Sequence, residues 1–320
     1  MSVLVTGGAG YIGSVTVDAL VDTGEDVVVL DDLSTGFADS VNEAARFVRG
    51  DIGDSDLVAK LVDEYGIDSC IHFAGKIAVG ESVGNPAAYF DSNVARPLRL
   101  LDALVESGVA HVVFSSSAAV YGDPSTVPIP EDHPTEPTNP YGRTKLIFEG
   151  ILSDYDAAYG VRSVSLRYFN AAGGATLRRE RHDPETHLIP LVLDAAAGRR
   201  RAVVVFGNDY DTPDGSAIRD YVHVADLAKA HVLALGYIRG GGTTRRLNLG
   251  TGSGHSVLEV IEIVRQVTGR GVPVELGERR PGDPTRLVAD PREANEVLGW
   301  ASTSDSALRF IAESAWKHRD

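Results

Sequence analysis

The chain has 320 residues, a hydrophobic share of 43% and a formal net charge of −15. This length suits one large domain or two closely joined ones, and the composition is typical of a folded globular protein. The negative charge argues against non-specific binding to nucleic acid or to an anionic membrane surface. The chain shows no signal peptide and no apolar run near the ~18 residues of a membrane helix, so we expect a cytoplasmic protein.

A glycine-rich segment near the start of the chain is the first informative feature. Residues Val3–Gly13 read Val-Leu-Val-Thr-Gly-Gly-Ala-Gly-Tyr-Ile-Gly, and an amphipathic helical pattern follows over 14–22. Gly8, Gly10 and Gly13 form G-x-G-x-x-G between a predicted strand and a predicted helix. Such glycines permit a tight turn and the close approach of a pyrophosphate, which the helix N-terminus attracts. The pattern predicts a dinucleotide site.

The next predicted strand, 25–30, ends at two acidic residues, Asp31 and Asp32. Asp31 lies 18 residues after Gly13, close to the roughly 20 expected for the acid that binds the adenosine ribose. A carboxylate at this place repels a 2′-phosphate, so the sequence favours NAD over NADP. The alternative is that Asp31 only caps the following turn.

Strands and helices then alternate strictly through the first half of the chain. The expected strands are 46–48, 69–73, 111–115 and 163–168, and the expected helices are 55–65, 86–106 with a kink at Pro97, and 141–159. This alternation predicts an α/β fold with a doubly wound parallel (Rossmann) sheet, in which ligands lie beyond the carboxyl ends of the strands. Candidate residues at or just past those ends are Asp31, Asp51, Gly75, Ser117 and Asn170.

After residue 168 the alternation loosens into a smaller mixed α/β region. Expected there are a surface loop over 173–185, helices over 187–197, 226–237 (with Asp226 as N-cap) and 257–268, and strands over 202–206, 219–224, 246–249 and 273–276. We therefore predict a dinucleotide-binding domain of residues 1–167, rejoined by about 213–235, and a substrate-binding domain of 168–212 and 236–320. No linker separates them, so the ligand is expected in the cleft between them.

Three residues indicate redox chemistry on an alcohol. Tyr141 and Lys145 are spaced i, i+4 on one face of a predicted helix, and Ser117 lies at the end of a predicted strand. A tyrosine of pKa ~10 is a poor base at neutral pH, but a nearby ammonium and a positive nicotinamide ring favour the phenolate. The three side chains suit removal of a proton from a secondary alcohol while hydride leaves its carbon for NAD.

These features resemble the extended short-chain dehydrogenase/reductase superfamily, and further motifs are similar to its UDP-glucose 4-epimerase family. The motifs that carry the resemblance are Tyr11-Ile12-Gly13, His72-Phe73-Ala74-Gly75, Val79-Gly80-Glu81-Ser82, Phe114–Val120, Tyr121-Gly122, Pro140-Tyr141-Gly142, Leu166-Arg167-Tyr168-Phe169-Asn170, Phe206-Gly207-Asn208-Asp209-Tyr210, Arg219-Asp220-Tyr221-Val222-His223-Val224 and Asn248-Leu249-Gly250. They span nearly the whole chain, including its second half.

The resemblance implies an NAD-dependent isomerase that interconverts UDP-glucose and UDP-galactose, as in galactose metabolism. In that family Tyr141 takes the proton of the sugar 4′-hydroxyl, Ser117 positions its oxygen, and Lys145 binds the nicotinamide ribose. The 4-ketose turns about its pyrophosphate tether before the hydride returns, and NAD stays bound.

The resemblance also assigns the binding residues. For NAD they are Gly7, Gly10, Tyr11, Ile12, Gly13, Asp31, Asp32, Leu33, Ser34, Gly36, Asp51, Ile52, Phe73, Ala74, Gly75, Lys76, Asn93, Ser115, Tyr141, Lys145, Tyr168 and Phe169. For the UDP-sugar they are Ser117, Tyr141, Asn170, His187, Leu188, Val204, Phe206, Arg219, Arg280 and Asp283. No metal site is expected. The family commonly forms homodimers through two helices, here about 86–106 and 141–159.

The sequence departs from the family pattern in three places. Lys76 directly follows Gly75, whereas the familiar lysine comes one residue later, so its contact with NAD is in question. His187 stands where asparagine is frequent, which questions a side-chain contact there. Leu287 occupies a position that tunes room for an N-acetyl group, and leucine is neither the large aromatic nor the small residue.

Other functions remain open at this point. A 4-epimerase of UDP-N-acetylhexosamines or UDP-pentoses would use the same machinery with a different pocket. A sugar-nucleotide 4,6-dehydratase needs an added acid and base, typically just after the strand-end serine, where this chain has Ala118 and Ala119. A non-catalytic NAD-binding module would not need Ser117, Tyr141 and Lys145.

Overall fold

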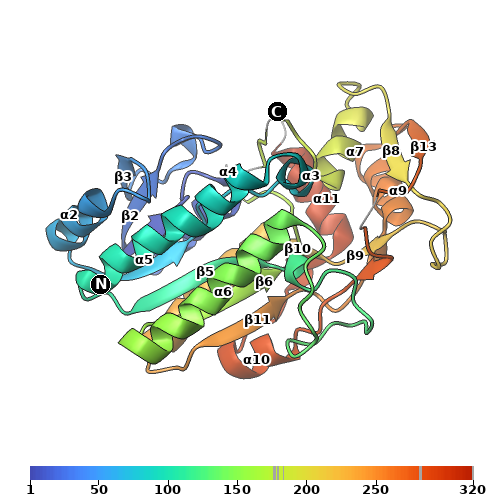
Figure 1. The fold of residues 1–320 in the computed structure, drawn as a ribbon. Coiled ribbons are helices and arrows are strands. Elements are labelled where there is room, and N and C mark those ends of the chain that lie inside the picture. Colours follow the sequence, from blue (N-terminus) through green and yellow to red (C-terminus); the bar gives the residue numbers. More distant parts are fainter. Residues whose placement is uncertain (176–177, 179, 183, 281–282, 319–320) are drawn as a thin grey trace.

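The computed structural model describes residues 1–175, 178, 180–182, 184–280 and 283–318. Among these residues a parallel sheet of seven strands forms the centre of the larger part of the molecule (Figure 1). From edge to edge its strands are β11 (Arg245–Leu249), β6 (Arg162–Tyr168), β5 (His111–Ser117), β4 (Ile67–His72), β1 (Ser2–Thr6), β2 (Asp26–Asp31) and β3 (Arg46–Arg49). The predicted doubly wound parallel sheet is confirmed.

The strand register brings the predicted site residues to one edge of the sheet. Thr6 at the end of β1 pairs with Leu30 of β2 and with His72 of β4, and Ser117 of β5 pairs with Tyr168 of β6. Parallel strands that end in step expose their last carbonyls and following loops at one edge. The residues at these strand ends are Gly7, Asp31, Phe73, Ser117 and Phe169.

Helices cover both faces of the sheet. On one face α1 (Tyr11–Asp22) packs against α8 (Val224–Arg239), and α8 also contacts β5 and β6. On the other face lie α2 (Ser55–Tyr65), α5 (Arg96–Glu106) and α6 (Pro140–Tyr159), of which α5 and α6 cross in front of the strands in Figure 1. Each face has its own buried aliphatic cluster, because strands buried on both sides are apolar along their length.

The long helix expected over 86–106 is interrupted, but at residues 91–95 rather than at Pro97, where the kink was predicted. Helix α4 (Pro86–Phe90) continues through a π-helical turn (Asp91–Ala95) into α5. Pro97 lies in the first turn of α5, where its missing N–H costs little. The π-helical turn places Asn93 in the interior, with 3% of its surface exposed, and π-bulges are frequent at functional sites.

The smaller region lies beyond one end of the sheet, at the right in Figure 1. It contains paired strands β8 (Val203–Phe206) and β13 (Val274–Gly277), the set β12 (His255–Ser256), β9 (Ile218–Arg219) and β14 (Arg286–Leu287), and the pair β10 (Tyr221–His223) and β7 (Asn170–Ala172). Its longer helices are α7 (Leu188–Ala196), α9 (Val257–Thr268) and α11 (Leu308–Lys317). Two short helices lie outside this region: α3 (Val79–Gly84) contacts α4 and α6, and α10 (Arg292–Leu298) contacts β11 and α8.

The prediction that residues 246–249 belong to the smaller region is wrong. They form β11, which pairs with β6 at the edge of the main sheet. Leu247 and Leu249 are completely buried there, in the same cluster as α8. We therefore propose that the dinucleotide-binding domain includes 245–249 in addition to 1–167 and about 213–235.

Two further predictions in the second half need correction. The single strand expected over 219–224 is divided between β9 and β10. Helix α8 begins at Val224 with His223 as its N-cap, three residues before the expected cap at Asp226. The buried Asp226 carboxylate instead accepts hydrogen bonds from the Thr303 N–H and hydroxyl at 2.8 and 2.9 Å, and so fastens the C-terminal segment to α8.

The segment 173–185, expected as a surface loop, contacts the dinucleotide-binding part through several of its described residues. The Arg178 guanidinium lies 3.1 Å from the Asp18 carboxylate on α1, and Arg181 lies 2.8 Å from Asp39. These contacts join a segment from the second half of the chain to the region around the glycine turn.

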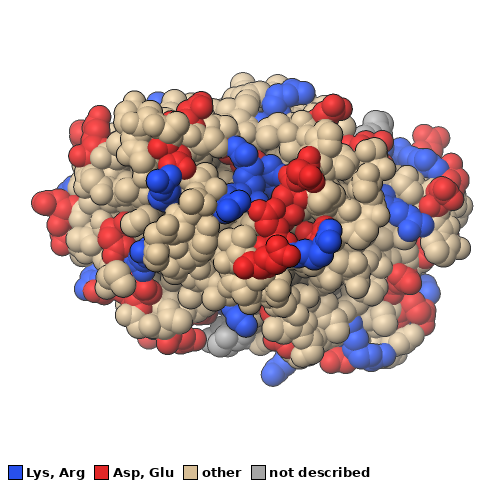
Figure 2. Space-filling model, turned by 90° about the horizontal axis from the view of Figure 1, so that it is seen from below, with Lys and Arg blue, Asp and Glu red and all other residues tan. Residues whose placement is uncertain are grey.

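Charged side chains are interspersed over the surface. On the face shown in Figure 2, the clusters of Lys and Arg side chains are small and several lie beside Asp or Glu, so this face has no broad basic area. Among the described residues, no helix is both long enough and apolar enough to cross a membrane.

Candidate active site

The glycine turn between β1 and α1 is tightly closed. Gly7 has φ +72°, and a Cβ there would lie 2.5 Å from the Ala74 nitrogen. A Cβ on Gly13 would lie 2.2 Å from the Gly7 oxygen, so any side chain at Gly13 would open the turn. Gly10 caps α1 without a side-chain acceptor, which leaves N–H groups of the first turn available to an anion. The turn therefore fits a pyrophosphate.

Asp31 lies beside this turn at the end of β2. One carboxylate oxygen accepts the Ala9 N–H at 3.0 Å and the other accepts the Leu33 N–H at 2.9 Å. The second bond is the cap considered as an alternative from sequence, and the first ties the acid to the glycine turn as well. Burial raises the pKa of Asp31. The other predicted ribose-side residues continue the same loop, namely Asp32, Leu33, Ser34 and Gly36.

The loops after β3 and β4 complete this half of the edge. Asp51 follows β3, and the Asp51 carboxylate pairs with the Arg96 guanidinium at 2.8 Å. The next residue, Ile52, is buried. The loop after β4 carries Phe73, Ala74, Gly75 and Lys76. The Lys76 ammonium lies 3.2 Å from Glu81, so the side chain whose cofactor contact was in question is held at an exposed ion pair.

Asn93 connects the loop after β4 to the helix that carries Tyr141. Its Oδ1 accepts the Lys76 N–H at 2.8 Å, and its Nδ2 donates to the Lys76 carbonyl at 2.9 Å. The same Nδ2 donates to the Thr144 hydroxyl at 3.1 Å, and Thr144 donates in turn to the Tyr141 carbonyl at 2.7 Å. Asn93 thus fixes the relative position of two segments of the predicted site.

Ser117, Tyr141 and Lys145 come together as predicted. Tyr141 and Lys145 occupy the first turns of α6, whose N-cap Asn139 accepts the Gly142 N–H at 2.9 Å. The Ser117 hydroxyl hydrogen-bonds the Tyr141 side chain. Lys145 is buried, and its ammonium lies 5.8 Å from the centre of the Tyr141 ring. Serine, tyrosine and lysine therefore share one small volume.

Without the cofactor, the electrostatics of this group favour the protonated phenol. Burial raises the pKa of Tyr141, and the hydrogen bond from Ser117 only partly opposes that rise. Without the cofactor the ammonium does not lower this pKa, because Lys145 donates to the Ser115 carbonyl at 2.7 Å rather than to the phenol. The lowering was predicted from the ammonium together with the positive nicotinamide ring, and it stays a prediction. Burial lowers the pKa of Lys145 to about 8, opposed by the Glu149 carboxylate one turn further along α6.

Tyr168 and Phe169 follow at the end of β6 and are both buried. The Tyr168 hydroxyl hydrogen-bonds His231 of α8. Burial and this bond hold the Tyr168 ring in place beneath the edge where Ser115 and Ser117 lie.

Four predicted substrate residues gather in the smaller region. Arg280 donates to the Asp283 carboxylate at 2.8 Å, and its guanidinium lies 4.8 Å from the centre of the Phe206 ring, which is 39% exposed. Arg219 interacts electrostatically with both Asp283 and Arg280, and burial lowers its pKa. A surface with two guanidinium groups beside an exposed aromatic ring suits a diphosphate and a planar base.

The remaining substrate candidates lie on separate elements of the smaller region. Asn170 begins β7, Leu188 begins α7 and Val204 lies within β8. His187 precedes α7, but its ring Nδ1 lies 2.6 Å from the Glu180 carboxylate and 2.8 Å from that of Glu185. The His187 backbone N–H also donates a hydrogen bond to the Glu185 carboxylate. The described structure therefore directs this side chain toward two carboxylates, in keeping with the doubt raised from sequence.

Two groups of residues were not identified from the sequence. One is the cluster Glu180, His182, Glu185 and His187, which the spacing Glu-x-His-x-x-Glu-x-His signals in retrospect. The other is the buried ion pair between Glu149 and Arg167 beneath Lys145, at 2.7 Å. No local pattern distinguishes these two charges from exposed ones.

Comparison with known proteins agrees with this geometry. The model of the NAD dependent epimerase/dehydratase family matches residues 3–250. The chain is 48% identical to UDP-glucose 4-epimerase of Corynebacterium glutamicum over 99% of its length and 95% of the relative's, and 50% identical to that of Streptomyces lividans over 98% and 94%.

Solved structures are similar over the full chain. UDP-glucose 4-epimerase from Brucella ovis, in complex with NAD, has a TM-score of 0.96 at 49% identity and covers 99% of this chain and 98% of its own. The enzyme from Bifidobacterium longum, in complex with NAD⁺ and UDP, has a TM-score of 0.93 at 38% identity and covers 100% and 98%. The chain therefore belongs to the NAD dependent epimerase/dehydratase family and, within it, groups with the UDP-glucose 4-epimerases.

Proposed function

We propose that this protein is an NAD-dependent epimerase that interconverts UDP-glucose and UDP-galactose by transient oxidation at C4′ of the sugar. The observation that carries the proposal is the shared location of Ser117, Tyr141 and Lys145 at the sheet edge that also holds the glycine turn. A base, a hydroxyl and a cation then meet at the place where a dinucleotide would end. This is the arrangement that oxidation and reduction of an alcohol require.

The carboxyl edge of the sheet supplies the cofactor site of this proposal. The glycine turn and the start of α1 hold the pyrophosphate, and Asp31 faces the adenosine ribose. The loop after β4 and the buried Asn93 approach the nicotinamide end, because Asn93 ties that loop to the turn that carries Tyr141. The other residues assigned to NAD surround this path, at Asp51, Ile52, Ser115, Tyr168 and Phe169.

The proposed chemistry at the sugar uses the three clustered side chains. When bound, NAD accepts a hydride from C4′ and returns it to the opposite face of the ketose. Tyr141 Oη takes the proton of the 4′-hydroxyl and later returns it, while Ser117 holds that oxygen by a hydrogen bond. The Lys145 ammonium adds positive charge beside Tyr141 and orients the nicotinamide ribose.

Substrate binding is assigned to the smaller region. Arg219 and Arg280 make charge-assisted hydrogen bonds to the diphosphate, and the exposed Phe206 ring lies by the uracil. Asp283 accepts from ribose hydroxyls, a role compatible with its contact to Arg280. Asn170, Leu188 and Val204 line the remaining sides.

The homodimer and the cytoplasmic location are parts of the same proposal. Apolar side chains on the helices near the expected contact support the dimer, since Val79 and Val83 on α3 are 45% and 65% exposed and Ile147 on α6 is 36% exposed. Light scattering on the purified protein measures the dimer directly.

The test is epimerisation by the purified protein without added NAD. UDP-galactose and UDP-N-acetylgalactosamine are supplied separately, and the products are separated by chromatography. Conversion of UDP-galactose supports retained NAD and the proposed reaction, and the ratio of the two rates decides whether N-acetylated sugars are accepted. Absence of any product even with added NAD would refute the proposal.

Tyr141→Phe keeps the ring and removes the proton acceptor. We expect this variant to retain NAD and UDP binding but to lose epimerase activity by at least the ~100-fold typical of a missing general base. Tyr159→Phe is the matched control, because Tyr159 lies on the same helix and is 62% exposed. Full activity in Tyr141→Phe would contradict the mechanism.

A further inference from the structure

Four potential metal ligands converge between β7 and α7, outside the proposed catalytic centre. Glu180, His182, Glu185 and His187 each offer one ligand atom, and these atoms all lie within 4.8 Å of one another. The two carboxylates are the least exposed, at 7% and 15% of their side-chain surfaces, whereas the His187 side chain is 36% exposed. The cluster is therefore mostly enclosed by protein and open to solvent on its histidine side.

Hydrogen bonds within the cluster do not satisfy its polar atoms. His187 Nδ1 carries at most one hydrogen, yet it faces Glu180 at 2.6 Å and Glu185 at 2.8 Å. His182 Nδ1 is buried without a hydrogen-bond partner, although it lies 3.3 Å from the Glu180 carboxylate. A ring N–H at His182 Nδ1 would lack a hydrogen bond of good geometry, and a lone pair there would face the negative carboxylate, so a cation between the two groups satisfies both.

We propose that Glu180, His182, Glu185 and His187 bind one divalent transition-metal ion, with Zn²⁺ as the best match. Two imidazole nitrogens and two carboxylate oxygens form a four-ligand set of the kind that zinc prefers. The cation replaces the single shared proton, accepts the lone pair of His182 Nδ1 and neutralises both carboxylates. Mg²⁺ and Ca²⁺ favour all-oxygen sites and fit this set less well.

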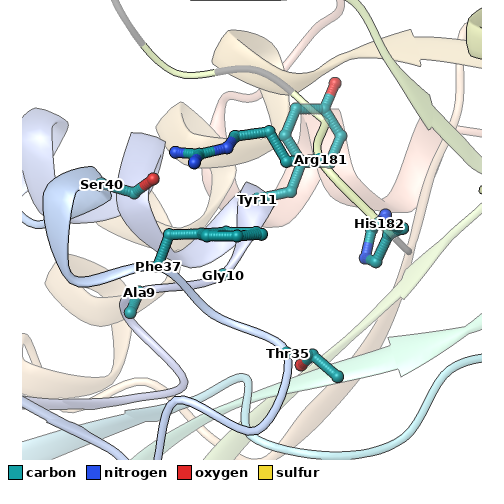
Figure 3. Close-up of a pocket in the computed structure, with 8 residues that line it drawn as sticks. All are labelled: Ala9, Gly10, Tyr11, Thr35, Phe37, Ser40, Arg181 and His182. Atoms are coloured by element: carbon teal, nitrogen blue, oxygen red, sulfur yellow. The ribbon is translucent and has the colours of Figure 1, made fainter. Parts of the chain in front are cut away.

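The neighbourhood of the cluster indicates what the ion does. Arg181, between two ligands, places its guanidinium 3.8 Å from the centre of the Phe37 ring, and Tyr11 donates to the Gly173 carbonyl at 2.6 Å. Figure 3 shows Arg181 and His182 beside Gly10 and Tyr11, around a cavity of about 30 Å³. A bound ion would fasten this segment over the glycine turn, so its role is structural.

The first experiment measures binding on the NAD-loaded protein. After dialysis against a chelator, Zn²⁺ is titrated by calorimetry and the bound metal is counted by elemental analysis. We expect one equivalent per chain and an increase in melting temperature on adding Zn²⁺, because a ligand that binds only the folded state stabilises it. Co²⁺ in place of Zn²⁺ should give the visible absorption of a four-coordinate site.

Variants separate this site from adventitious binding. His182→Gln should weaken Zn²⁺ binding by more than the about 10- to 100-fold that loss of an outer-shell hydrogen bond costs a metal site, and it should abolish the Co²⁺ absorption. His133→Gln, which changes a histidine outside the cluster, should alter neither. Glu185→Gln provides a second ligand variant if His182→Gln folds poorly.

Binding no stronger in the unmodified protein than in His182→Gln and Glu185→Gln would overturn the proposal, and the four residues would then form only a hydrogen-bonded cluster. Epimerase activity is not the readout, so failure of this inference leaves the proposed reaction untouched.

Discussion

The buried ion pair beneath Lys145 allows a quantitative test of how the catalytic helix is supported. The Glu149 carboxylate accepts from Arg167 Nε at 3.0 Å and Nη2 at 2.7 Å and from the Ser116 hydroxyl at 2.5 Å, and both charged side chains are almost completely buried. Glu149→Gln keeps the shape of the side chain but leaves the Arg167 charge without a counter-ion. Breaking a buried pair in this way costs about 3–5 kcal/mol.

Urea denaturation at a fixed NAD concentration measures the free energy of unfolding of Glu149→Gln, Arg167→Met and the double variant. The double variant leaves neither partner of this pair facing an unpaired charge of the other, so its loss should be smaller than the sum of the two single losses by about 0.5–3 kcal/mol. Glu106→Gln, on the exposed surface of α5, is the control and should stay within about 0.5 kcal/mol of the unmodified protein. A loss below about 1 kcal/mol in Glu149→Gln, or strict additivity, would refute the reasoning.

Three further predictions concern the turn, the lysine and the substrate cluster. Gly13→Ala should lower the NAD content of the purified protein, because the new Cβ would lie 2.2 Å from the Gly7 oxygen. Gly150→Ala is the control: a Cβ at this helical position has no neighbouring atom within 4 Å, so the substitution should stabilise the folded protein by about 0.5–1 kcal/mol. The pKa of Lys145 is lowered from 10.5 to about 8 by burial, so the unfolding free energy of the NAD-free protein should rise with pH between these values, and Lys145→Met should flatten that slope. Arg219→Met should cost about 1.5–3 kcal/mol of UDP binding free energy by calorimetry; an unchanged affinity would remove Arg219 from the substrate site.

The sequence predicted the larger part of the fold because each feature there has a local cause. Buried parallel strands are apolar over their whole length, and the helices between them show amphipathic periodicity. The smaller region was predicted less well, since its strands have only two to four residues. The placement of β11 was missed because its partner β6 lies about eighty residues earlier, and only the folded chain shows that β6 still has a free edge.

The predicted site follows the same division. The glycine turn, Asp31 and the pair Tyr141 and Lys145 could be predicted because their spacing is local. The cluster around Glu180 and His187 was not found, because the segment was assigned to a surface loop on the basis of its charge. Charge in a sequence does not distinguish a solvated loop from one whose carboxylates face histidines.

The raised pKa of Tyr141 links the basicity of this residue to the charge of a bound cofactor. The phenol is partly buried, which raises its pKa, and the Lys145 ammonium is held by a backbone carbonyl, so the protein alone favours the protonated form of Tyr141. A phenolate therefore requires additional positive charge, which the oxidised nicotinamide ring carries and the reduced ring does not. On the proposed mechanism we therefore expect Tyr141 to give up its proton most easily when a hydride acceptor is present, and to hold a proton most firmly after the hydride has moved. In this way the state of the cofactor and the basicity of Tyr141 are linked, and the linkage depends on the burial that makes Tyr141 a poor base on its own.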